Sequence, residues 1–323
     1  MFKNISGFAV MLFTKSLFAQ FPGPVGTIGT TAIYKDSSIF TAWATDCSIQ
    51  RGLMDISNFS LGLTNIGDSS MALGISGIND VVSLGDGGSA ILNFDYPITN
   101  GPGYDFAVFE NAFNDVFLEL AFVEVSSDGL NYVHFPATSN AQTTSQIEAF
   151  SNSGDASKIN NLAGKYRKHY GTPFDLQEIA GAPLVNINAI THVKIIDVVG
   201  SIDPLYATYD INNNPINDPF PTAFASGGFD LDALGIIHQN TTTAIKGNTI
   251  NALNVFPNPF SQNEQLTIHS NQPLLEIVVK NNLGQLIFKG SESDLKNMQF
   301  SDGLFTLEIK TTQGTFIKKV IKQ

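Results

Sequence analysis

The stretch SGGFDLDALGII, residues 226–237, has the apolar content of a buried β-strand and yet carries two aspartates. Successive side chains of a strand alternate between its two faces. The alternation predicts one face with Phe229, Leu231 and Ala233 and another face with Asp230, Asp232 and Leu234. Burying two unpaired carboxylates costs free energy. The strand therefore requires either a partner that neutralises the aspartates or a solvent-facing place at the edge of a sheet.

Short apolar runs broken by Gly, Asn and Asp continue along most of the 323 residues, of which only 14% are charged. This pattern is typical of all-β proteins. We expect strands at 89–95, 105–111, 118–128, 132–137, 191–200 and 229–237. A polar segment, 138–163, is expected to form a surface loop with a short helical piece. The predicted fold is a jelly-roll-like β-sandwich followed by a small Ig-like β-sandwich.

The composition divides the chain into four parts. Residues 1–19 have Lys3 before a short apolar run and end in SLFA, which resembles a secretory signal peptide. Residues 20–239 form the first predicted domain, 240–252 a polar linker and 253–323 a second domain. The apolar run is too short to span a bilayer, and no other segment is long enough, so we expect no transmembrane segment.

The two predicted domains differ in charge. Residues 20–239 hold 7 basic and 23 acidic residues, a formal charge of −16, whereas residues 240–323 hold 8 and 6, a charge of +2. A strongly acidic domain repels nucleic acids and anionic lipid headgroups and attracts cations. We therefore expect no nucleic-acid partner.

Four motifs near the C-terminus occur in a fixed order: FPNPF (256–260), NNLGQLIFKG (281–290), SDGLFTLEI (301–309) and TFIKKVIKQ (315–323). Together they resemble the C-terminal sorting domain of the type IX (Por) secretion system of Bacteroidetes. The resemblance implies that residues 253–323 are recognised by the type IX translocon. It also implies a secreted or outer-membrane-surface protein that first passes through the periplasm.

The first domain resembles a second family, in the segments 83–113, 121–136, 161–176, 191–203 and 216–238. These are similar to uncharacterised bacterial cell-surface proteins and, more loosely, to galactose-binding-like jelly rolls. That resemblance implies a structural calcium ion and loops at one rim that bind a ligand.

Oxygen-bearing side chains suggest where calcium would bind, since this ion prefers several carboxylate, amide and carbonyl oxygens. Asp230 and Asp232 are the first candidates, with Asp105, Glu110 and Asn111 as expected partners. The segment 209–220 adds Asp210 and Asp218, with Asp and Asn spaced two apart, although Pro215 replaces the turn glycine of an EF-hand. The alternative for that segment is a solvated Asn-rich turn.

One segment, GKYRKHYGTPFDL (164–176), concentrates aromatic and basic residues within the acidic domain. Aromatic and polar groups together suit contacts with sugars or other small ligands. The ligand-binding candidates are Tyr166, Arg167, His169 and Tyr170. The alternative is that the cations only pair with the acidic surface.

No zinc-protease HExxH motif and no GxSxG nucleophile elbow occurs, so no catalytic residue is assigned. The sequence therefore favours a secreted or surface-attached binding module, stabilised by calcium, that binds a glycan or another small ligand. A glycan-active hydrolase and a purely structural surface or adhesion protein are the alternatives.

Overall fold

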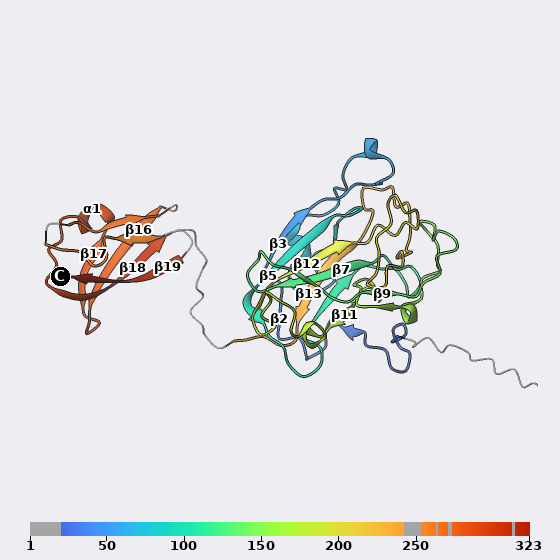
Figure 1. The fold of residues 1–323 in the computed structure, drawn as a ribbon, viewed down its shortest axis with the longest axis horizontal. Helices are drawn as coiled ribbons and strands as arrows, with labels where there is room; N and C mark the ends of the chain where they lie inside the picture. Colours follow the sequence, from blue (N-terminus) through green and yellow to red (C-terminus); the bar gives the residue numbers. More distant parts are fainter. Residues whose placement is uncertain (1–20, 242–252, 263, 271–272, 312–313) are drawn as a thin grey trace, which may run out of the picture. The chain divides into compact units, whose positions relative to one another are not determined.

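The structure is a computed structural model that describes residues 21–241 and 253–323, apart from 263, 271–272 and 312–313 (Figure 1). The chain divides into two compact units between Thr241 and Thr242, and each unit is described by itself. The expected signal peptide, 1–19, and most of the expected linker, 240–252, lie outside the described residues.

Strands make up 35% of the residues and helices only 6%, which confirms the all-β prediction. In the first unit, one sheet has the order β1-β11-β6-β13-β2, and β4 also pairs with β13. Its strands are β1 (Ile33–Tyr34), β2 (Ala42–Trp43), β4 (Val82–Ser83), β6 (Phe106–Glu110), β11 (Tyr170–Phe174) and β13 (Asp230–Ile236). All its strand pairs are antiparallel.

A second antiparallel sheet has the order β3-β5-β12-β7-β8. Its strands are β3 (Asp46–Gln50), β5 (Ser89–Ile98), β7 (Ala121–Ser126), β8 (Val133–His134) and β12 (Ile190–Asp197). Four short 3₁₀ helices lie in the connections: η1 (Phe59–Leu61), η2 (Ser69–Ala72), η3 (Ala156–Lys158) and η4 (Leu176–Ile179).

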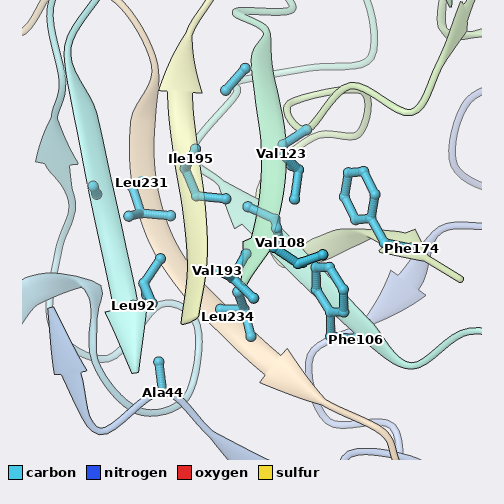
Figure 2. Close-up of a cluster of buried hydrophobic side chains, with 14 of the residues drawn as sticks. Ala44, Leu92, Phe106, Val108, Val123, Phe174, Val193, Ile195, Leu231 and Leu234 are labelled. Atoms are coloured by element: carbon cyan, nitrogen blue, oxygen red, sulfur yellow. The ribbon is translucent and has the colours of Figure 1, made fainter. Parts of the chain in front are cut away.

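The two sheets pack face to face around one apolar core, to which both contribute side chains. Figure 2 shows Leu92, Val123, Val193 and Ile195 of the second sheet facing Phe106, Val108, Leu231 and Leu234 of the first. These side chains are almost completely buried. Burial of apolar area at about 25 cal/mol per Å² is the dominant favourable contribution to such a fold.

The alternation predicted for 226–237 is wrong beyond Leu231. Leu231 pairs with Glu110 and Ala233 with the adjacent Phe109, so Asp232 is one extra residue, a β-bulge. Because the bulge reverses the faces, Leu234 joins Leu231 in the core and Ala233 packs on the opposite face of the sheet.

The segment 138–163 is more structured than the expected surface loop. β9 (Thr138–Ser139) pairs with β10 (Ile159–Asn160), and η3 supplies the expected short helical piece. Ile147, Ile159 and Leu162 are buried. Because the segment is mostly polar, its sequence did not indicate that these three apolar side chains are buried.

The second unit contains a two-stranded and a four-stranded antiparallel sheet, β14-β15 and β17-β16-β18-β19. The elements are β14 (Asn254–Phe256), β15 (Thr267–His269), β16 (Leu274–Asn281), β17 (Leu286–Gly290), α1 (Glu292–Leu295), β18 (Gly303–Thr311) and β19 (Gly314–Lys322). Phe260 of the FPNPF motif is buried against Phe300. Phe256 remains 41% exposed beside His269.

Candidate functional site

The bulge places the two aspartates of β13 in different surroundings. Asp230 accepts a hydrogen bond from the Ser83 hydroxyl. Asp232 accepts one from the Ser76 hydroxyl at 2.6 Å and another from the backbone N–H of Gly77 at 2.9 Å. Donors of this chain therefore hold both carboxylates, and each belongs to a separate group of polar residues.

Asp230 belongs to a group of six carboxylates, here named the carboxylate cluster. Four members lie at or near strand ends, where β6 and β12 finish and β7 and β13 begin, and two lie in loops. The members are Asp86, Glu110, Glu119, Asp197, Asp218 and Asp230. They lie close enough to raise one another's pKa by charge repulsion.

Backbone N–H groups supply much of the hydrogen bonding in the cluster. The donors are Ala112 to Glu110 at 2.6 Å, Phe229 to Asp197 at 2.7 Å, Ile56 to Asp86 at 2.7 Å and Leu120 to Asp218 at 2.8 Å. Such bonds favour the ionised carboxylates, but no ion pair within the described residues joins a cluster member to Lys, Arg or His.

Burial dominates the electrostatics of the cluster. It raises the pKa of Asp86 to about 7 and that of Asp230 to about 6. Burial followed by repulsion from cluster neighbours raises the pKa values of Glu110, Glu119, Asp197 and Asp218 well above the usual range. Unfavourable charge of this kind is relieved by a proton or by a bound cation.

Within the described residues, no group of three or more His, Cys, Asp or Glu side chains is arranged to hold a metal ion. The cluster nevertheless contains Glu110, Asp218 and Asp230, three of the residues predicted to bind calcium. Its hard oxygen donors are of the type that calcium prefers. Calcium binding here stays a prediction.

Asp232 belongs to a second group, which lines a pocket of about 230 Å³, here named the β13 pocket. Its lining residues are Gly77, Asp80, Val81, Asn111, Lys168, His169 and Asp232. The pocket thus joins Asn111 and Asp232, predicted as metal ligands, with His169, predicted as a ligand-binding residue. A bulge beside a binding site is a common way of re-aiming a side chain.

His169 gives the β13 pocket its most unusual feature. The Nδ1 atom is buried without a hydrogen-bond partner in the described structure. The backbone adopts a φ of +69°, and its carbonyl accepts a hydrogen bond from Lys35 N. A Cβ added to Gly77 would lie 2.7 Å from the ring, so only glycine permits this approach. Buried polar atoms are normally paired, so a ligand is a natural partner for Nδ1.

Asp232 also experiences opposing influences in this pocket. Burial raises the pKa of its carboxyl group, whereas the hydrogen bonds from Gly77 and Ser76 and the charges of His169 and Lys35 lower it. The net direction is upward. Hydrogen bonds and nearby positive charges therefore compensate the negative charge of Asp232 more fully than the charges of the carboxylate cluster are compensated.

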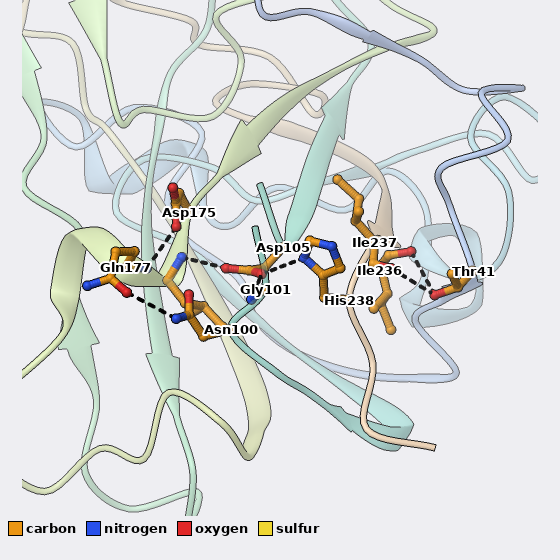
Figure 3. A network of polar contacts seen from close by, with 10 residues as sticks. Thr41, Asn100, Gly101, Asp105, Asp175, Gln177, Ile236, Ile237 and His238 are labelled. Atoms are coloured by element: carbon orange, nitrogen blue, oxygen red, sulfur yellow. Dashed lines mark hydrogen bonds and ion pairs between the residues drawn. The ribbon is translucent and has the colours of Figure 1, made fainter. Parts of the chain in front are cut away.

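Asp105 lies elsewhere and is paired with His238 (Figure 3). Its Oδ1 lies 2.8 Å from His238 Nδ1 and accepts the N–H of Gly101, while Oδ2 accepts the N–H of Leu176. Through these hydrogen bonds Asp105 links the segments that contain Gly101, Leu176 and His238. The structure does not bring it to the other predicted calcium ligands.

Asp210 also has partners of its own. Its Oδ1 accepts the N–H groups of Asn212 and Asn214, and its Oδ2 accepts the N–H of Ser139. These bonds organise a tight turn, as in the alternative considered for this segment. Asp210 is therefore separate from both groups described above.

The other ligand-binding candidates of 164–176 have structural partners. Tyr166 is 1% exposed and its hydroxyl bonds to Thr31, so its side chain is part of the core. Arg167 pairs with Asp115 and lies over the Tyr170 ring at 5.2 Å. Only His169 of these four residues lines the β13 pocket.

Sequence reasoning missed three members of the carboxylate cluster: Asp86, Glu119 and Asp197. Asp86 lies in the glycine-rich GDGGS stretch, which lacks the lysine of a phosphate loop. Asp197 ends the apolar run of β12. A carboxylate at the end of an otherwise apolar strand could have marked such residues as buried charges. Nothing in the sequence, however, indicated that these residues lie close together in space.

A larger cavity, of about 300 Å³, is lined by residues of 116–120, 140–159 and 217–219. Its amide groups already hold the loop together. Asn217 donates to the carbonyl groups of Gln142 and Ser145, and its oxygen accepts the N–H of Ile147. The β13 pocket, with its unpartnered imidazole nitrogen, is the better candidate for a ligand.

Comparison with known families identifies the second unit. Residues 254–323 match the secretion system C-terminal sorting domain. This sorting domain supports export by the type IX system, and the protein is accordingly a secreted or surface protein. No curated protein and no solved structure matches the chain.

The sorting domain is a β-sandwich-type domain whose polar surface differs from that of the first unit. On its four-stranded sheet, Glu276 pairs with Lys289 and Lys310, and Lys280 pairs with Glu308. Among the described residues of the whole chain, no helix is both long and apolar enough to cross a membrane.

We predict that, with chelator present, the first unit loses stability as the pH rises from 5 to 7.5. A carboxyl group whose pKa is higher in the folded state stabilises the fold below its unfolded pKa, near 4, and loses this contribution as the pH passes its folded value. For Asp86 and Asp230 the loss is on the order of 2–4 kcal/mol. Thermal unfolding at several pH values measures it.

Asp86→Asn with Asp230→Asn should reduce this pH dependence, because two of the six titrating carboxyl groups of the cluster become amides. Asp36→Asn, at an exposed position outside the cluster, should leave it unchanged. Equal slopes in the wild type and the double variant would show that Asp86 and Asp230 do not contribute to the pH dependence.

Proposed function

We propose that this protein is a binding module delivered to the cell surface, in which the first unit holds a ligand and the sorting domain directs export. The match of residues 254–323 supports the export part. The ligand part rests on the β13 pocket, above all on the buried His169 Nδ1 that lacks a partner within the described residues. The proposed ligand is a glycan or another small polar molecule.

The lining of the β13 pocket supports a polar ligand. Val81 is its only large apolar side chain among the lining residues, and Asn111, Asp80 and Lys168 present amide, carboxylate and ammonium groups. Its volume corresponds to roughly eight water molecules at about 30 Å³ each, enough for a single-ring molecule. A ligand with several hydroxyl groups would satisfy these side chains together.

We further propose that calcium stabilises the first unit through the carboxylate cluster. The observation behind this is the buried negative charge without a cationic partner in the described structure. Carboxylates of the cluster would supply part of the shell, and backbone carbonyl oxygens or water the remainder, as calcium sites commonly combine these ligands.

Deletion of residues 254–323 should retain the protein in the periplasm. The sorting domain carries the export motifs, whereas the sites described above all lie in the first unit. Immunoblotting of periplasm, cell surface and medium measures the distribution. As a matched control, residues 240–323 fused to a periplasmic reporter should carry the reporter outside. Normal secretion of the truncated chain would contradict the export proposal.

Binding to a glycan array should depend on the β13 pocket. For a glycan that the full chain binds, His169→Ala with Asn111→Ala should reduce affinity at least tenfold, because the ligand loses two polar contacts. His134→Ala, on the partly exposed β8, should bind normally. Binding unaffected by the double variant would assign the ligand to another site, and release of cleaved sugar would favour a hydrolase.

Chelator should lower the melting temperature of the first unit, and added calcium should restore it. A ligand that binds only the folded state stabilises it by about 2.7 kcal/mol at a hundredfold excess over its dissociation constant. Glu110→Gln with Asp230→Asn should abolish the response. Asp210→Asn should keep it, since Asp210 lies in its own turn. A wild-type melting temperature indifferent to both chelator and calcium would overturn this proposal.

A further inference from the structure

The few basic side chains of the first unit are distributed unevenly. Arg167 pairs with Asp115, Lys194 with Glu124, and Arg51 donates to backbone carbonyl groups. Lys165 is buried beside Tyr166. These four cations are thus engaged by the fold itself.

Two of the remaining lysines lie at the β13 pocket, together with His169. Lys168 is exposed and lines the pocket. The ammonium group of Lys35 lies 4.0 Å from the position that a Cβ on Gly77 would occupy. Lys35 also pairs with Asp36 at 3.9 Å, so Lys168 is the lysine at this pocket that has no ion pair among the described residues.

The same pocket also contains negatively charged and hydrogen-bond-accepting groups. Asp80, Asp232 and the Asn111 amide supply hydrogen-bond acceptors, and Asp232 is already held by Ser76 and Gly77. A neutral sugar would leave the Lys168 ammonium without an ion-pair partner among the described residues, whereas Lys35 already pairs with Asp36 at 3.9 Å. A phosphate, with nearly two negative charges, would meet repulsion from Asp80 and Asp232. A ligand with one negative charge and several hydroxyl groups can pair with the cationic side chains and also donate hydrogen bonds to the acceptors.

We propose that the β13 pocket binds a hexuronate, a six-membered sugar ring that carries a single carboxylate. The carboxylate is recognised by Lys168 and His169, with Lys35 adding positive potential. The hydroxyl groups donate to Asp80, Asp232 and the Asn111 oxygen. The inference rests on the proposed function and specifies its ligand class.

Calorimetric titration of the full chain with matched pairs of trisaccharides tests this assignment. The pairs are oligogalacturonate with oligogalactose, oligoglucuronate with oligoglucose and oligomannuronate with oligomannose, each pair sharing one linkage. In at least one pair the acidic member should bind ten times more tightly or better. The preference should weaken as salt rises, because exposed charges are screened.

Lys168→Gln should remove most of the preference for the acidic sugar, and His169→Asn should weaken binding of that sugar. Lys158→Gln, an exposed lysine at the larger cavity, is the matched control and should change neither. Thermal unfolding confirms that each variant is folded.

The remaining outcomes separate this inference from the proposed function. Equal or tighter binding of the neutral sugar, still dependent on His169, would overturn the hexuronate assignment and leave the pocket as a binding site. Acidic binding that ignores both Lys168→Gln and His169→Asn would also overturn it. Absence of binding by all the sugars would contradict the assignment, and only a failed glycan array as well would count against the proposed function.

Discussion

The packing of the first unit depends on the neutralisation of buried carboxylates where strands of both sheets begin and end. Glu110 ends β6, Asp197 ends β12 and Asp230 begins β13, so the same strands that build the core bring these charges together. Transfer of an isolated carboxylate into a low-dielectric interior costs far more than any single contact returns. Backbone N–H donors offset part of that cost, and a proton or a cation must offset the rest.

The bulge at Asp232 connects this constraint with the proposed binding site. By inserting one residue, it keeps Leu231 and Leu234 on the core side and directs Asp232 to the donors of Ser76 and Gly77. The β13 pocket and the carboxylate cluster therefore share one strand. A change in the charge of the cluster acts on the same strand that positions the pocket.

Local sequence was sufficient for much of the fold. The apolar content of 226–237 predicted a strand that the structure places at Asp230–Ile236. The bulge could not be foreseen, because the extra residue is defined only by its register against β6. Within the FPNPF motif, Phe260 is buried whereas Phe256 is 41% exposed, a difference that the motif alone does not reveal.

The sites were harder to predict, because their members come from distant segments. Glu110, Asp218 and Asp230 were identified by residue type, but Asp105 and Asp210 are equally acidic and serve local hydrogen bonds instead. His169 was identified through its basic surroundings, whereas the role of Gly77 follows only from the close approach of the imidazole ring. Tertiary contacts, not composition, separate these cases.

Site-resolved titration of the carboxyl carbons of Asp86 and Asp230 by NMR, with chelator present, tests the central claim most directly. The account predicts that Asp86 titrates at a pH of about 7 and Asp230 at about 6, and that calcium moves both values downward. Titration of both groups near pH 4, unchanged by calcium, would contradict the account, because it would show that the cluster carries no uncompensated charge.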